Sequence, residues 1–292
     1  MKQQLCLVIL LIGVGALALA QQTTTAQNTA PTSLPGAISK VYKTIGETQL
    51  YLHIYQPAER QSNTKLPAIV FFFGGGWRQG SPAQFVEHCK YLAARGMVAI
   101  TAEYRVKSRH NVTPLECIAD AKSAMRWVRA HATEFGIDAD RIAAGGGSAG
   151  GHLAAAVATL REFDDKADDL KVSPSPQALV LFNPVLDTAE ISADGFGDKK
   201  LAASPLHNVR KGLPPTIIFH GTADTTVPFT QATRFCEAMT KQGSRCEVKA
   251  YEGRQHGFFN YGRGDNEDFK TTLRAADDFL TSLGWLKGKP TL

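Results

Sequence analysis

Short apolar runs, separated by amphipathic stretches, recur along most of the chain. In 48–55, aliphatic residues alternate with tyrosine or histidine, which is typical of a half-buried antiparallel strand. Six later runs read as strands, and most are nearly continuous in apolar residues, as expected for strands covered on both faces. These predicted strands are 68–73, 97–102, 141–144, 178–182, 216–219 and 246–251.

Helices are predicted in the gaps between these strands. Segments 81–84 and 113–116 each read as a capping box with proline at the first helical position, and Gly96 and Gly136 are the expected stops. Apolar residues at helical spacing mark the last helix, 269–283. The alternation predicts an α/β fold with one doubly wound, mostly parallel sheet and antiparallel strands at its N-terminal end. Ligands of such a sheet bind at the carboxyl ends of the strands.

Composition narrows the class of protein. The chain has 292 residues, of which 43% are hydrophobic and 20% charged, so it has enough apolar mass to bury a core and is not a disordered chain. This length suits one large α/β domain or two small ones. The net charge of +5 is spread without a basic run, which indicates neither a nucleic-acid interface nor a polybasic membrane patch.

The N-terminus reads as a targeting segment. Lys2 precedes an apolar run at 5–19, and small residues at Ala18 and Ala20 suit a signal-peptidase site, so 1–20 is predicted to be a cleaved signal peptide. The alternative is a membrane anchor, but the run is shorter than the ~20 residues that a span needs. We therefore expect a secreted or periplasmic protein without stable membrane insertion after cleavage. A flexible leader at 21–37 and one domain at 38–287 are expected to follow.

Four cysteines remain after the predicted cleavage: Cys89, Cys117, Cys236 and Cys246. An even number in an exported chain permits disulfides. The favoured pair is Cys236 with Cys246, because the first lies late in a predicted helix, the second starts the next strand and Gly243 allows the turn. The alternative is that all four are buried thiols. No histidine or cysteine spacing fits a metal site, so we expect no metal.

Residues 146–150, Gly-Gly-Ser-Ala-Gly, follow a predicted strand and precede the helix-forming run 152–160. A strand-to-helix turn this tight forces Ser148 into strained dihedral angles, and the glycines at 146 and 150 remove side chains that would clash. Ser148 would then project at a helix N-terminus as a nucleophile. The alternatives are a plain tight turn and a phosphate-binding loop, and the chain lacks the lysine pattern of such a loop.

A serine nucleophile needs a base, and the base needs a carboxylate that orients it. On this scaffold the expected order is serine, acid, histidine. Three histidines lie well downstream of the serine: His207, His220 and His256. His256 follows strand 246–251 and Asp224 follows the preceding strand, so the two loops are neighbours if the strands pair in sequence. Singly, His256 could be a surface histidine and Asp224 a turn former, but order and placement together favour a triad. Asp187 is the reserve acid.

The stretch 73–77, Phe-Gly-Gly-Gly-Trp, follows the first long apolar strand. Consecutive glycines let the main chain turn its N–H groups towards a substrate, and such donors stabilise the oxyanion of acyl transfer. We expect the amides of Gly75, Gly76 and Ala149 to form this oxyanion hole. The alternative is a flexible glycine bend.

These motifs together resemble the α/β-hydrolase family, in the esterase and lipase branch near hormone-sensitive-lipase-like and secreted feruloyl- or acetylxylan-esterase-like enzymes. The resemblance covers about residues 40 to 285 and rests on five motifs, at 74–77, 103–105, 146–151, 220–228 and 256–258. It implies an α/β-hydrolase fold, a catalytic serine at Ser148, acid at Asp224 and base at His256, and no cofactor. The implied substrates are small-molecule esters or acylated or feruloylated polysaccharides, while no oligomeric state is indicated.

One position departs from the family pattern, because its oxyanion loop usually begins with histidine and here Phe73 stands there. Any lid is expected to come from 161–177 or 187–215, the two stretches that break the strand–helix rhythm, so we expect an open or lightly covered cleft. Trp77 and Phe258, together with Phe259, are candidate substrate-binding aromatics, with a place in the core as the alternative.

Two other functions fit the same motifs. The first is a serine exopeptidase of the prolyl-oligopeptidase type, against which the sequence shows no preceding propeller domain. The second is a non-catalytic binding protein of the same fold, whose signature would be a missing triad residue.

Overall fold

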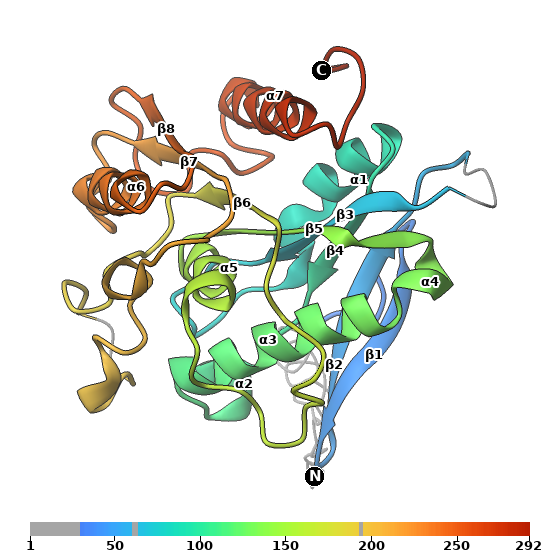
Figure 1. Cartoon of the computed structure of the whole chain (residues 1–292), viewed down its shortest axis with the longest axis horizontal. Coiled ribbons are helices and arrows are strands. Elements are labelled where there is room, and N and C mark those ends of the chain that lie inside the picture. The colour runs from blue at the N-terminus through green and yellow to red at the C-terminus, as the bar shows by residue number, and fades with distance from the viewer. Residues whose placement is uncertain (1–29, 60–63, 193–194) are drawn as a thin grey trace, which may run out of the picture.

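Eight strands form one sheet in the computed structural model, which describes residues 30–59, 64–192 and 195–292 (Figure 1). The strand order is β1-β2-β4-β3-β5-β6-β7-β8. Strand β2 runs antiparallel to both of its neighbours, and the six strands from β3 to β8 are parallel to one another. The strands are β1 Ile38–Ile45, β2 Thr48–Tyr55, β3 Leu66–Phe72, β4 Val98–Ala102, β5 Ile137–Gly147, β6 Ala178–Phe182, β7 Thr216–Gly221 and β8 Cys246–Tyr251. The predicted mostly parallel sheet is confirmed.

The N-terminal edge strand β1 is the element whose position the sequence did not reveal. Its register against β2 shifts between Val41 and Lys43, so a bulge interrupts the alternation of side chains. The predicted signal peptide at 1–20 and the leader up to residue 29 lie outside the described residues. Within the described ranges, no helix has the length and apolar character needed to cross a membrane.

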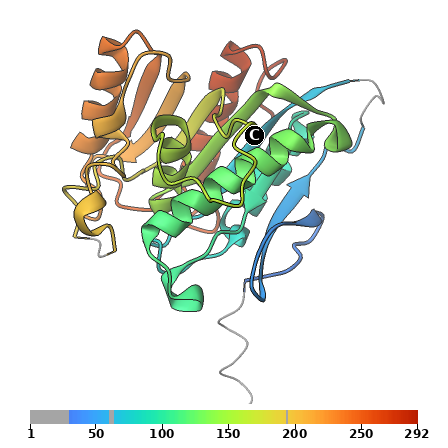
Figure 2. The ribbon, with the colours of Figure 1, turned by 60° about the horizontal axis from the view of Figure 1, so that its bottom comes forward.

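Helices cover both faces of the sheet (Figures 1 and 2). Their bounds are α1 Val86–Ala94, α2 Lys107–His110, α3 Pro114–Ala130, α4 Ala132–Phe135, α5 Ala149–Thr159, α6 Thr230–Lys241 and α7 Glu267–Ser282, with short 3₁₀ turns η1 Pro82–Phe85, η2 Gly197–Lys199 and η3 Leu206–Asn208. The buried side chains of α3, α5 and α6 share one apolar cluster, and those of α1 and α7 share the other. The sheet is therefore doubly wound.

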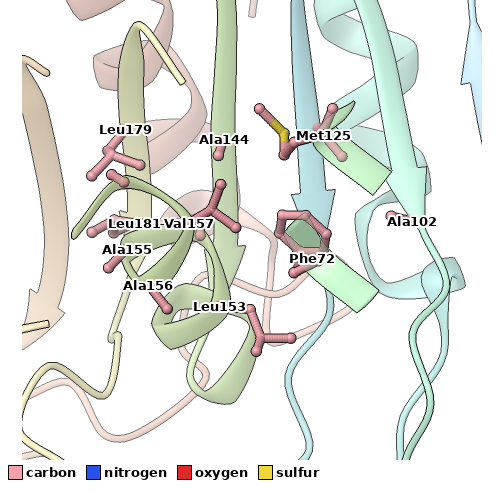
Figure 3. Packing of buried hydrophobic residues seen from close by; sticks show 14 of the residues in the cluster. Phe72, Ala102, Met125, Ala144, Leu153, Ala155, Ala156, Val157, Leu179 and Leu181 are labelled. Carbon is pink, nitrogen blue, oxygen red and sulfur yellow. The ribbon is translucent and has the colours of Figure 1, made fainter. Parts of the chain in front are cut away.

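The larger cluster lies between the sheet and the helices α3 and α5. Figure 3 shows Leu153 and Val157 of α5 with Met125 of α3 beside Phe72 and Leu181 of the sheet. All five side chains are buried. Because α5 starts at the proposed nucleophile, this packing anchors the helix that carries it.

The two predicted capping boxes have different outcomes. At α3, the Thr113 hydroxyl accepts from the Leu115 amide and the Glu116 carboxylate accepts from the Thr113 amide, which confirms that box. The helix is interrupted at His131, and the short helix α4 that follows ends at Gly136. At η1, Ser81 accepts from Ala83, as expected. The prediction that the Gln84 side chain bonds back to the start of this helix is wrong, because that side chain bonds to Gly74 and Asn260 instead, as described below.

The irregular segment 161–177 is fixed to α3 by ion pairs. The buried Lys122 ammonium donates to the Glu162 carbonyl and pairs with Asp164 at 3.3 Å. Arg126 pairs with Asp164 at 2.5 Å and with Asp168 at 3.0 Å. This segment therefore packs along the side of the domain.

The predicted disulfide between Cys236 and Cys246 is present, joining the end of α6 to the start of β8 with a Cα–Cα distance of 5.2 Å. Cys89 and Cys117 are free and buried. The expectation for the local pair is thus confirmed.

A buried histidine of α1 makes stability sensitive to acid. His88 is enclosed by phenylalanines, including Phe85 and Phe269, and neither ring nitrogen has a hydrogen-bond partner in the described part of the chain. Burial lowers its pKa from 6.5 to about 3, and the pKa values of His53 and His152 also fall to about 4. Between pH 6.5 and these values the unfolded chain binds protons that the folded chain does not, so stability falls as pH falls.

Replacing His88 by leucine is therefore expected to flatten this acid dependence. From pH 7 to pH 5, His88 alone should account for a loss of about 2 kcal/mol in the free energy of unfolding. Urea unfolding at both pH values measures the loss in the parent and in His88→Leu. Equal losses in the two proteins would contradict the proposed protonation of His88 on unfolding.

Candidate active site

Three loops at the carboxyl ends of parallel strands bring the predicted triad together. Ser148 directly follows β5, Asp224 follows β7, and His256 follows β8. Because β7 pairs with β8 and β6 joins β7 to β5, these loops lie along one edge of the sheet. This is the edge at which open α/β sheets bind their ligands.

Ser148 occupies a strained turn between β5 and α5. Its φ of 54° and ψ of −118° lie outside the ordinary regions for a residue with a side chain. A Cβ on Gly146 would lie 2.4 Å from the Gly150 carbonyl oxygen, and one on Gly150 would lie 2.0 Å from that of Phe72. The glycines at these two positions are therefore required by close backbone approach, as the sequence predicted.

The imidazole of His256 links the serine to the acid. Its Nε2 lies 2.9 Å from Ser148 Oγ, and its Nδ1 lies 2.7 Å from Asp224 Oδ2. Since an ionised carboxylate only accepts, Nδ1 carries the proton and Nε2 is free to accept from the serine hydroxyl. The structure thus brings the three predicted residues into one hydrogen-bonded chain that can carry a proton from the hydroxyl.

Asp224 is held by more than its catalytic partner. Its Oδ1 accepts from the amides of Thr226 and Val227, at 2.8 and 2.9 Å. Burial alone raises the pKa of this carboxyl, but hydrogen bonds from His220, His256 and the Val227 amide outweigh burial and hold the pKa well below its usual value. Asp224 therefore stays ionised wherever His256 can act as a base.

His220 is a contributor that sequence reasoning considered only as a possible base. The ring is fully buried at the end of β7, and its Nε2 lies 3.0 Å from the Val227 carbonyl and 3.3 Å from Asp224 Oδ2. Both neighbours are acceptors, so Nε2 carries a proton and donates. His220 thus positions the acid rather than the serine. The feature of the sequence that could have indicated this role is its place at the end of a strand, four residues before Asp224.

The reserve acid Asp187 has other partners. Its Oδ2 pairs with Arg234 at 3.1 Å, and its Oδ1 accepts from the Ala189 amide at 3.0 Å. His207 approaches it at 3.7 Å. Asp224, not Asp187, contacts His256.

The expected oxyanion donors lie beside Ser148. Gly75 and Gly76 have φ values of 125° and 63°, and a Cβ on Gly75 would lie 2.2 Å from the Gln79 carbonyl oxygen. Within the described ranges, the amides of Gly75, Gly76 and Ala149 donate to no protein acceptor. Such free donors beside a nucleophile suit a developing oxyanion.

Phe73, where the family usually has histidine, is secured by packing. Its buried ring stacks on Tyr104 with 4.1 Å between ring centroids. The Tyr104 hydroxyl donates to the Phe73 carbonyl at 2.7 Å. The start of the glycine loop is therefore held by an aromatic stack and a buried hydrogen bond.

Gln84 joins the glycine loop to the loop of the base. Its Oε1 accepts from the Gly74 amide at 2.6 Å, and its Nε2 donates to Asn260 Oδ1 at 2.8 Å. Asn260 in turn donates to the Gly257 carbonyl at 2.8 Å. This Gln84–Asn260 bridge connects the residue after the base with the residue before the oxyanion donors.

Replacing Gln84 by alanine is expected to lower kcat for ester hydrolysis by about tenfold, with a smaller change in KM, because loosened oxyanion donors act mainly in the transition state. Gln84→Glu keeps the acceptor for the Gly74 amide but loses the donor to Asn260, so its kcat should lie between those of the parent and Gln84→Ala. Steady-state kinetics on a 4-nitrophenyl ester measures both constants, with Gln49→Ala on the remote strand β2 as the control. Parent-like kcat in Gln84→Ala would show that the bridge is dispensable.

A cleft of about 870 Å³ opens at this edge and includes Ser148 and His256 in its walls. The other lining residues come mainly from segments 74–84 and 256–263. No described residue of 161–177 or 187–215 lines it, so neither stretch acts as a lid over the serine in this structure.

Two of the candidate substrate-binding aromatics lie in the core. Trp77 and Phe258 are 3% and 5% exposed, and neither lines the cleft. Trp77 packs edge-on against His152 and Phe196, whereas Phe258 packs against Tyr251. Phe259 does line the cleft, beneath Gly147, where a Cβ would lie 2.5 Å from its ring. For Trp77 and Phe258 the structure therefore shows the alternative, a place in the core, and Phe259 borders the cleft although it is only 1% exposed.

The arrangement supplies a nucleophile, a base, an orienting acid and free amide donors in one cleft. These are the groups that acyl transfer through a covalent intermediate requires. Among the described residues, no group of three or more histidine, cysteine or acidic side chains could hold a metal ion.

Comparison with known proteins gives two family matches. The BD-FAE model matches residues 52–193, which include Ser148, and the prolyl oligopeptidase family model matches residues 190–282, which include the acid and the base. Esterase LipC of Mycobacterium tuberculosis is 33% identical over 220 residues, or 66% of this chain and 53% of its own length. Acetylxylan esterase of Xylanibacter ruminicola is 27% identical over 76% of this chain and 46% of its own. The chain therefore spans about half the length of such curated relatives.

Among solved structures, esterase 2 of Thermogutta terrifontis covers nearly the same span as this chain. Its apo form is 51% identical with a TM-score of 0.84, and the alignment covers 87% of this chain and 97% of that one. That esterase has also been solved phosphorylated by paraoxon and with butyrate bound.

Proposed function

Because the chain belongs to the esterase branch of the α/β-hydrolase superfamily, we propose that it hydrolyses carboxylic esters with Ser148 as nucleophile, His256 as base and Asp224 as orienting acid. The observation that carries the proposal is the unbroken chain from Ser148 Oγ to His256 Nε2 at 2.9 Å and from His256 Nδ1 to Asp224 at 2.7 Å. No other side chain needs to move to start proton transfer.

In the proposed reaction, His256 Nε2 takes the hydroxyl proton as Ser148 Oγ bonds to the ester carbonyl carbon. The carbonyl oxygen becomes an oxyanion that the amides of Gly75, Gly76 and Ala149 receive. The intermediate collapses, the C–O bond to the alcohol breaks, and His256 returns its proton to the departing oxygen. Water then bonds to the acyl carbon as His256 takes its proton, the bond between that carbon and Ser148 Oγ breaks, and His256 returns the proton to Oγ as the acid leaves.

Four observations support a finer proposal, a secreted esterase for short acyl groups on small molecules or carbohydrates. The related Thermogutta esterase 2 has been solved with propionate and with butyrate bound, which suits short acyl groups. One relative is an acetylxylan esterase, which suits acylated carbohydrate. Export is supported by the apolar N-terminal run and by the Cys236–Cys246 disulfide, since such bonds persist in oxidising compartments.

The match of 190–282 to the prolyl oligopeptidase family raises a serine exopeptidase as a second candidate. An enzyme that holds the free amino end of a peptide needs a carboxylate to pair with the ammonium group. No aspartate or glutamate is among the residues that line the cleft, whose charged side chains include Arg109 and Arg263. The lining therefore favours the esterase.

A fluorophosphonate probe tests the proposal, because it labels only an activated serine. Labelling of the parent that disappears in Ser148→Ala supports a serine hydrolase, whereas labelling that persists assigns the nucleophile elsewhere. 4-Nitrophenyl esters are then compared with aminoacyl 4-nitroanilides. Cleavage of the esters is the expected result, and cleavage of the anilides alone would replace the esterase by the exopeptidase.

A further inference from the structure

Unpaired positive charge surrounds the cleft. Arg109 and Arg263 line it, whereas Arg78 and Lys107 line a separate hollow that shares Gly76 with the cleft. In the described part of the chain, none of these four cations comes within ion-pair distance of a carboxylate. A cleft with two arginines and no acid in its wall, and two more cations nearby, attracts anionic ligands.

Arg263 places a guanidinium beside the catalytic base. Its Nη1 donates to the carbonyl oxygen of His256 at 3.0 Å, and its other donors have no partner among the described residues. A Cβ on Gly257 would lie 3.6 Å from Arg263 Cζ, so the guanidinium packs against the backbone that follows His256. Arg263 is exposed, which leaves its free donors open to a ligand.

Arg109 contributes charge at the other side of the glycine loop. Its Nη1 donates to the Gly80 carbonyl at 2.8 Å, while Nε and Nη2 are buried without partners in the described ranges. Burial raises the pKa of its acidic neighbour Glu103 to about 7, so that carboxyl is only partly ionised at neutral pH. The positive charge of Arg109 is therefore incompletely neutralised within the protein.

From this geometry we infer that the cleft prefers esters whose alcohol part carries a carboxylate, and that Arg263 binds this carboxylate. The inference rests on the proposed esterase function and adds the substrate class. Guanidinium groups match carboxylates with paired, charge-assisted hydrogen bonds. Arg109, Arg78 and Lys107 add a positive field that favours the same substrates.

The position of Arg263 selects the alcohol part over the acyl part. His256 must deliver a proton to the departing alcohol oxygen, so that oxygen lies next to the His256 ring during cleavage. Arg263 is bonded to the backbone of that same residue. Ser148, His256 and Arg263 line the same cleft, so a carboxylate a few atoms beyond the departing oxygen, as on an acidic sugar, is the group that we place at Arg263.

The test uses two esters that differ only in charge, 4-acetoxybenzoate and 4-acetoxybenzamide. In the parent at low ionic strength, kcat/KM should be about five- to tenfold higher for the carboxylate, and the advantage should shrink as salt is added. In Arg263→Gln the ratio of the two kcat/KM values should fall to about one, and in Arg263→Glu it should fall below one. Each kcat/KM is divided by the rate constant for hydroxide-catalysed hydrolysis of the same ester before the ratio is taken, so that the difference in intrinsic reactivity between the two esters cancels.

Arg254→Gln is the matched control, since Arg254 stands in the same loop, pairs with Asp268 at 2.9 Å and does not line the cleft. It removes the same charge, and its ratio should equal that of the parent. A ratio near one in the parent, or a ratio that Arg263→Gln leaves unchanged, would overturn the inference.

A second pair, mono-4-nitrophenyl succinate and 4-nitrophenyl butyrate, carries the charge on the acyl part. A preference for the anion in this pair alone would also overturn the inference, because it would place the carboxylate away from the departing alcohol. Hydrolysis of charged and neutral esters at equal rates removes only the substrate class and leaves the esterase intact. Hydrolysis of none of the four removes the esterase function and this inference with it.

Discussion

Replacing Ser148 by alanine is expected to lower kcat for 4-nitrophenyl ester hydrolysis by about 10⁴- to 10⁶-fold. The substitution removes the hydroxyl oxygen that lies 2.9 Å from His256 Nε2, and with it the covalent route. Steady-state rates, measured at enzyme concentrations high enough to detect the residual activity of the variant, give the ratio of the two kcat values.

The loss should be chemical and not structural. Alanine removes a single oxygen from the turn, whose glycines at 146 and 150 and strained backbone remain, so the unfolding midpoint should stay close to that of the parent. The double variant Ser148→Ala with His256→Ala should be little worse than Ser148→Ala alone, because the base has no proton to take once the hydroxyl is gone. Single effects that multiply in the double variant would contradict the proposed unit.

Replacing Asp224 by asparagine should lower kcat by about 10³- to 10⁴-fold. In the parent, Oδ1 accepts from two amides, while Oδ2 faces the N–H groups of His256 and His220. The asparagine side chain has a single oxygen and cannot accept from both sets of donors. If that oxygen keeps the bonds to the backbone amides, the NH₂ group of the asparagine faces His256 Nδ1. That ring then carries its proton on Nε2 and can no longer accept from Ser148.

Asp187→Asn is the control for the acid, because Asp187 follows the neighbouring strand β6 and is also buried but pairs with Arg234. Its kcat should stay within a few-fold of the parent. Rates at saturating ester for the parent and both asparagine variants decide the assignment. A large loss in Asp187→Asn with a small one in Asp224→Asn would exchange the two roles.

Much of the fold was predictable because it depends on short-range rules. Buried parallel strands read as apolar runs, and β2, β6 and β8 were predicted with the bounds that the structure has. The edge strand β1 escaped because its bulge breaks the alternation on which such predictions rely. Likewise, Gln84 looked like a helix cap, since the sequence shows three-residue spacing but not the Gly74 amide that competes for its side chain.

The sequence by itself determined the doubly wound sheet, the strained serine turn and the order in which serine, acid and base follow their strands. Each of these depends on neighbours along the chain or on the rule that parallel strands end at one edge. Only the tertiary structure decided that Gln84 ties two loops together and that Trp77 and Phe258 are buried. It also decided that Arg263 bonds to the backbone of His256 and pairs with no acid among the residues described. Those outcomes depend on which side chains come into contact when distant loops pack together, and the spacing of neighbouring residues does not predict such contacts.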